Sequence, residues 1–98
     1  MSKRSVLIKT VKEDFKTFLH GYEDYEEFSY PLGKGLALEV SYDNDGAYIT
    51  GNIEAVNVDT EECEESESVE WLTSEDSLPD EFLEVMNYIL NCCTDWKN

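Results

Sequence analysis

Hydrophobic residues recur at three- and four-residue spacing over residues 5–20, which is the spacing of one face of a helix. The apolar positions are Leu7, Ile8, Val11, Phe15, Phe18, Leu19 and Tyr22. Lys9, Lys12 and Lys16 fall mostly on the other side of that helix. We therefore expect an amphipathic N-terminal helix that packs one face on the rest of the protein and exposes the other.

A strict alternation of apolar and polar residues begins at Leu36 and predicts a half-buried strand over residues 36–43. Turn-forming residues occupy 43–46, so the chain is expected to reverse there into a hairpin. The return strand is expected to run from Ala47 to about Asp59. Its apolar positions change face after residue 55, which predicts a bulge near Asn57 or a second buried face.

Two shorter strands and a second helix complete the pattern. Phe28, Tyr30 and Leu32 alternate around Pro31, which favours a strand at a sheet edge. Another strand is expected over residues 68–72. Residues 77–93 are expected to form the last helix, starting at a capping box made by Ser77 and Asp80. The apolar stripe of this helix comprises Phe82, Val85, Met86, Ile89, Cys93 and Trp96.

The order of these elements predicts an α+β fold, with a small antiparallel sheet of three to four strands between an N-terminal and a C-terminal helix. Both helices are expected to pack on one face of the sheet. Residues 1–98 have the size of a single compact domain. The 12% aromatic content is too high for a disordered acidic tail, so we expect a packed core.

Charge is divided sharply along the chain. Residues 17–98 carry 21 carboxylates against two fixed positive charges, Lys34 and Lys97, a net charge of −19. The first sixteen residues carry five positive charges against two carboxylates, a net charge of +3. Nucleic acid and anionic membranes attract lysine and arginine, so the whole-chain charge of −16 argues against direct binding to either. A basic protein is the expected partner.

Carboxylates are densest over residues 59–76, where they occupy half of the positions. A solvated loop between two strands would explain such a run on its own. Because the rest of the chain is acidic too, we predict that the run is a partner-binding surface. Its residues are Asp59, Glu61, Glu62, Glu64, Glu65, Glu67, Glu70, Glu75 and Asp76. A secondary contact is predicted at Glu23, Asp24, Tyr25, Glu26 and Glu27.

Candidate chemical groups are few, and we expect no enzyme activity, cofactor or metal site. His20, the only histidine, stands at the expected end of the first helix, where a cation interacts favourably with the helix dipole. Residues 43–54 match an EF-hand loop poorly, and a tight turn explains them better. Cys63, Cys92 and Cys93 form neither an even disulfide framework nor a CxxC metal motif, which is typical of reduced cytoplasmic thiols.

Small size, strong acidity and the lack of a catalytic motif are typical of phage-encoded anti-defence inhibitors. Such proteins block restriction, CRISPR or DNA-repair proteins, in some cases as DNA mimics. The sequence predicts an inhibitor of this type, cytoplasmic in the host cell, that binds a nuclease or another basic nucleic-acid-binding protein. Two alternatives stay open: an immunity or antitoxin protein that caps a basic toxin, and an acidic domain adapted to high salt. Homodimerisation is also left open.

Overall fold

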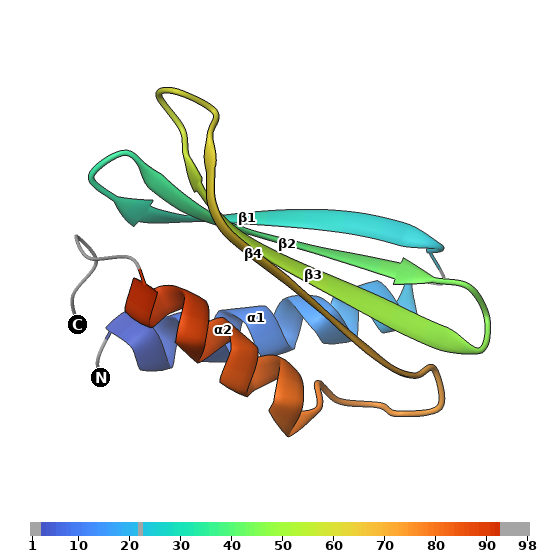
Figure 1. Cartoon of the computed structure of the whole chain (residues 1–98). Helices are drawn as coiled ribbons and strands as arrows, with labels where there is room; N and C mark the ends of the chain where they lie inside the picture. The colour runs from blue at the N-terminus through green and yellow to red at the C-terminus, as the bar shows by residue number, and fades with distance from the viewer. Residues whose placement is uncertain (1–2, 22, 93–98) are drawn as a thin grey trace.

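The computed structural model describes residues 3–21 and 23–92, apart from the side chain of Glu64. It has the predicted α+β fold, with a helix, four antiparallel strands in one sheet and a second helix (Figure 1). The strands follow one another across the sheet in chain order, so each pair of neighbours is a hairpin. The elements are α1 (Lys3–His20), β1 (Tyr25–Gly33), β2 (Leu36–Asn44), β3 (Tyr48–Asn57), β4 (Cys63–Leu72) and α2 (Asp80–Cys92).

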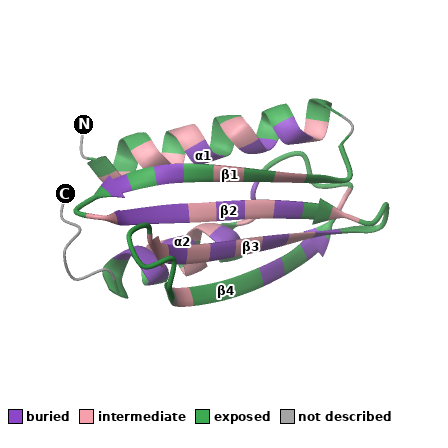
Figure 2. Cartoon of the chain, turned by 90° about the horizontal axis from the view of Figure 1, so that it is seen from above, coloured by how far each residue is buried: buried purple, intermediate pink, exposed green. Residues whose placement is uncertain are grey.

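Both helices lie on the same side of the sheet, as expected (Figure 1). α1 packs on β1, and α2 packs on β3 and β4. Seen from above, the strands cover α2, and no helix lies on their upper side (Figure 2). An antiparallel sheet tolerates this arrangement because alternate residues can face water. Within residues 3–21 and 23–92, neither helix is both long enough and hydrophobic enough to cross a bilayer.

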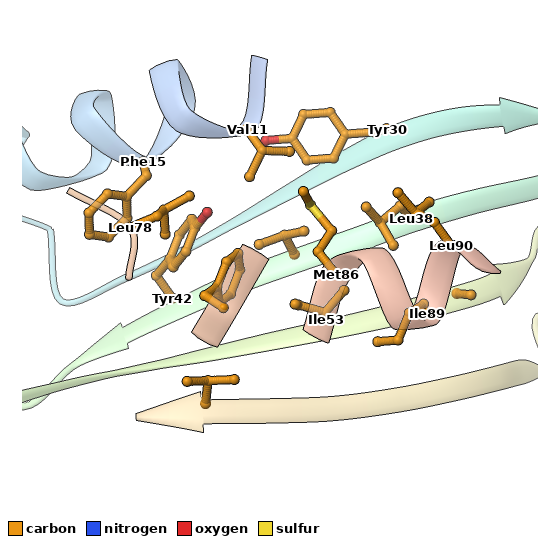
Figure 3. Packing of buried hydrophobic residues seen from close by; sticks show 14 of the residues in the cluster. Val11, Phe15, Tyr30, Leu38, Tyr42, Ile53, Leu78, Met86, Ile89 and Leu90 are labelled. Carbon is orange, nitrogen blue, oxygen red and sulfur yellow. The ribbon is translucent and has the colours of Figure 1, made fainter. Parts of the chain in front are cut away.

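Tyr42 is the centre of the hydrophobic core between the sheet and the helices (Figure 3). Its ring is fully buried, and its centroid lies 5.1 Å from that of Phe15 in α1 and 5.9 Å from that of Phe82 in α2. Tyr42 therefore joins the two helices through β2. Aromatic rings at these separations stabilise one another beyond the burial of their area, by about 0.5–1.5 kcal/mol for each pair.

Register around the central hairpin agrees with the sequence pattern. Leu38, Val40 and Tyr42 of β2 are fully buried, and the intervening residues face away from the helices. A bulge lies near Asn57, as expected, but its extra residue is on β4 and not on β3. Ala55 pairs with Glu65 and Val56 pairs with Cys63, which leaves residue 64 as the extra residue. The apolar residues of β3 change face beside this irregularity.

Two predicted boundaries are wrong. β4 begins at Cys63 rather than near residue 68, so four of the nine carboxylates of the acidic run lie on an edge strand and not in a loop. Backbone pairing with β3 holds the strand in place even though its first half is polar. α2 begins at Asp80 rather than at Ser77. Leu78 is buried in the core, and the first helical turn is closed by the Phe82 amide, which donates to the Pro79 carbonyl (3.1 Å).

Candidate acidic binding surface

The uncovered side of the sheet, here called the open face, is made of alternate residues from all four strands. Backbone register aligns these residues in rows across the sheet. In one row Ser29 stands opposite Glu39, which stands opposite Glu54, followed by Ser66. In each row the strands are about 4.8 Å apart, and successive rows are about 6.6 Å apart. The open face is thus a regular grid of side-chain positions.

Five carboxylates of known side-chain position occupy this grid, and they come from all four strands. The four strands contain no lysine, arginine or histidine. Small polar residues fill most of the remaining central positions, among them Ser41, Asn52 and Ser68. The open face therefore carries negatively charged side chains with short, uncharged polar side chains between them. Its carboxylates are Glu27, Glu39, Asp43, Glu54 and Glu70.

A shallow cavity of about 210 Å³ lies on the open face over β1, β2 and β3. Glu27, Glu39 and Glu54 line it, together with Ser41. At its rim the Tyr25 hydroxyl donates a hydrogen bond to Glu27 Oε2 (2.8 Å). This bond to a carboxylate raises the pKa of Tyr25 above its usual value. The cavity therefore combines three carboxylates with an exposed aromatic ring.

Exposed hydrophobic side chains stand at the end of the open face nearest the β2–β3 turn. Tyr25 of β1, Tyr48 of β3 and Leu72 of β4 are each about half exposed. Tyr48 and Leu72 are direct cross-strand partners. Aromatic residues beside a polar array are typical anchors of protein interfaces. The open face thus offers apolar contact area next to its carboxylates.

Asp45 is engaged in the β2–β3 turn and does not belong to the open face. Its Oδ1 accepts hydrogen bonds from the backbone amides of Ala47 (2.9 Å) and Tyr48 (2.8 Å). The Tyr48 amide, followed by the Ala47 amide, lowers the pKa of the Asp45 carboxyl. Gly46 adopts a positive φ of 101°. These contacts confirm a tight turn at this position.

The predicted acidic run is spread over three places. Asp59, Glu61 and Glu62 lie in the β3–β4 turn, and Glu75 and Asp76 lie in the loop between β4 and α2. These two groups are separated by the full length of β4, about 33 Å for a ten-residue strand. The run is therefore not one continuous patch.

Strand β4 divides the rest of the run between the two sides of the sheet. Glu70 pairs with Thr50 and belongs to the open face. Glu65 and Glu67 pair with the core residues Ala55 and Ile53, so they point to the helix side. The strand position of Glu64 is described, whereas its side chain is not.

The predicted secondary contact is also divided. Tyr25 and Glu27 lie on the open face, opposite Asp43 and Ser41. Glu26 pairs with Tyr42 and lies on the helix side, and Glu23 and Asp24 precede β1. Glu39, Asp43 and Glu54 were absent from both predicted sets. The alternation over 36–43 already placed Glu39 and Asp43 away from the core, and this was the available signal.

The remaining candidate groups of the sequence are dispersed. His20 is the last residue of α1, as expected, and is exposed. Cys63 and Cys92 are exposed free thiols, and Cys93 lies outside the described residues. Among the described residues, no three histidine, cysteine or acidic side chains are arranged to hold a metal ion. No family model, curated protein or solved structure matches this chain.

Proposed function

We propose that this protein is a small acidic inhibitor, phage-encoded, that binds a basic nucleic-acid-binding protein and occupies its nucleic-acid site. The observation that carries the proposal is the open face, the side of the sheet that no helix covers. It presents five carboxylates and no basic residue. A protein surface that binds phosphates carries lysine and arginine side chains. Such a surface is complementary in charge to the open face.

Spacing on the open face also suits this role. Carboxylates one row or one strand apart are separated by about 5–8 Å at the backbone. A phosphate strand carries one charge per about 3.4 Å of axis, so the two charge densities are of the same order. Between the carboxylates, Ser41 and Asn52 offer hydrogen-bonding groups and no bulky side chain that would keep a partner away. We infer that the sheet face, rather than the 59–76 run as a whole, is the main contact.

The test is binding to purified nucleases with DNA in competition. The probes are a restriction endonuclease, a CRISPR effector nuclease and a DNA-repair glycosylase, each assayed for cleavage of a labelled duplex. At least one should be inhibited, with an affinity that falls as salt is raised and as competing duplex is added. An immunity protein would instead inhibit one toxin and no other nuclease. Unchanged activity of every probe would contradict the proposal.

Matched variants locate the contact. The triple variant E39Q/D43N/E54Q removes three charges from the open face, and E61Q/E62Q/E67Q removes three from the β3–β4 turn and the helix side of β4. Both variants have the same net charge, so a difference between them reports position. We expect inhibition to fall at least about tenfold more in the open-face variant, a difference of about 1.4 kcal/mol in binding free energy. A larger loss of inhibition in E61Q/E62Q/E67Q would instead place the contact in the 59–76 run.

A further inference from the structure

A groove between α1 and α2 contains the main group of positive charges described in this acidic protein. Lys12 and Lys16 of α1 form one wall, and the loop before α2 and the first turns of α2 form the other. A second depression, of about 450 Å³, continues the groove along α1 past Lys9. The residues that line the groove belong to α1, α2 and the loop before α2. Both helices lie on the side of the sheet opposite the open face (Figure 1). The two surfaces therefore differ in charge and in direction.

Hydrophobic side chains lie among these lysines. Ile8 lines the depression beside Lys9, and it is partly buried. Leu78 and Leu83 line the part of the groove between the helices, which has a volume of about 290 Å³. The groove thus has the make-up of an amphipathic binding site, with aliphatic contact area and ammonium groups along one edge.

The ammonium groups of the three lysines, Lys9, Lys12 and Lys16, form neither an ion pair nor a hydrogen bond within residues 3–21 and 23–92. They stand at helix positions three and four apart, so they share one side of α1 and span about 10 Å along its axis. This is the spacing that carboxylates on a partner helix would also have. Two carboxylates, Glu13 and Asp80, border the same groove.

We propose that the groove between α1 and α2 docks an acidic amphipathic helix of a partner protein. Aliphatic side chains of that helix would contact Ile8 and Leu83, and its carboxylates would pair with the lysines. The two bordering carboxylates argue against nucleic acid, because a phosphate strand carries a charge every ~3.4 Å and could not avoid them. A helix can place its carboxylates at the lysines alone. This surface is independent of the open face.

The test uses a synthetic peptide of about four helical turns, with glutamates at the lysine spacing beside a leucine stripe. A second peptide carries glutamine at the same positions, and a single-stranded oligonucleotide of equal charge is the third probe. Binding is followed by fluorescence anisotropy, and the contact is mapped by amide chemical shifts. We expect the acidic peptide to bind more tightly than both other probes, with shifts at Ile8, Lys12, Lys16 and Leu83.

Matched variants separate a specific site from general attraction to lysine. K12Q/K16Q removes two charges from the groove, and K3Q/K34Q removes two from elsewhere. Glutamine and lysine have similar helix propensities, so both variants should fold. We expect affinity for the acidic peptide to fall about tenfold in the first variant and to stay within about twofold in the second. Equal losses, shifts outside the groove, tighter binding of the oligonucleotide or no peptide binding would each overturn the proposal.

Discussion

Glu39 of β2 and Glu54 of β3 stand directly opposite one another on the open face. The two carboxylates therefore repel each other across about 5 Å of sheet, which opposes pairing of the central strands. We expect Glu54→Gln to raise the free energy of unfolding by about 0.2–1 kcal/mol. Urea unfolding in low and high salt would measure this. The gain should shrink in high salt, because salt screens the repulsion in the wild type. A gain independent of salt would contradict this cause.

The same substitution, tyrosine to phenylalanine, should change the free energy of unfolding differently at two buried tyrosines. The Tyr30 hydroxyl donates to Asp14 Oδ2 (2.7 Å), whereas the buried Tyr42 hydroxyl has no hydrogen-bond partner among the described residues. Tyr30→Phe should lower the free energy of unfolding by about 1.5–3 kcal/mol, because a bond to a charged group is lost. Tyr42→Phe should leave it unchanged or raise it by up to about 1 kcal/mol. Thermal unfolding of both variants decides this, and a loss in Tyr42→Phe as large as that in Tyr30→Phe would contradict it.

Gly51 is required by close packing. A Cβ atom at this position would lie 2.6 Å from Phe82 Cε2 and 2.7 Å from Trp71 Cη2. We expect Gly51→Ala to lower the free energy of unfolding by about 1–3 kcal/mol, because the ring of α2 must move away from β3. Phe82→Leu should lower the free energy of unfolding less in the Gly51→Ala variant than in the wild type. A double-mutant cycle would measure this coupling. Strict additivity of the two substitutions would show that the clash is relieved elsewhere.

Acid should remove the contribution of Asp45 to the β2–β3 turn. The turn amides lower the pKa of this carboxyl in the folded state, so its stabilising effect is present above the usual aspartate pKa of about 3.9 and is lost below it. We expect Asp45→Ala to be less stable than wild type at neutral pH and the difference to shrink as pH falls below about 4. Denaturant unfolding at several pH values would test this. Asp45→Asn keeps the oxygen acceptor. Its free energy of unfolding at neutral pH should therefore lie between those of the wild type and Asp45→Ala.

Local pattern predicted the central hairpin well, because the burial of Leu38, Val40 and Tyr42 follows directly from their alternation. The first half of β4 was missed for the opposite reason. Residues 63–67 carry polar side chains on both faces, and their strand conformation comes from backbone hydrogen bonds to β3, which leave no trace in side-chain type. The start of α2 was missed because Ser77 resembles a cap, whereas Leu78 is buried in the core ahead of a helix that begins at Asp80.

The candidate surface was predictable only in part. Density of charge along the chain singled out residues 59–76, but density does not say which face of a strand a residue occupies. Glu39 and Glu54 are fifteen positions apart in sequence, and only the register of β2 against β3 makes them neighbours. The groove between α1 and α2 was not foreseen either, since it depends on where two distant helices lie on the sheet.

The glutamates on both sides of β4 bear on how two copies of this protein interact through their sheet edges. The outer edge of β4 is an unpaired strand edge, and such edges readily add to one another and lead to intermolecular sheets. Two β4 edges that approached each other would bring Glu65, Glu67 and Glu70 against the same residues of the other chain. The bulge beside Ala55 further disturbs a continuous edge. Repulsion between these glutamates therefore opposes edge-to-edge pairing of β4 between two copies of the protein.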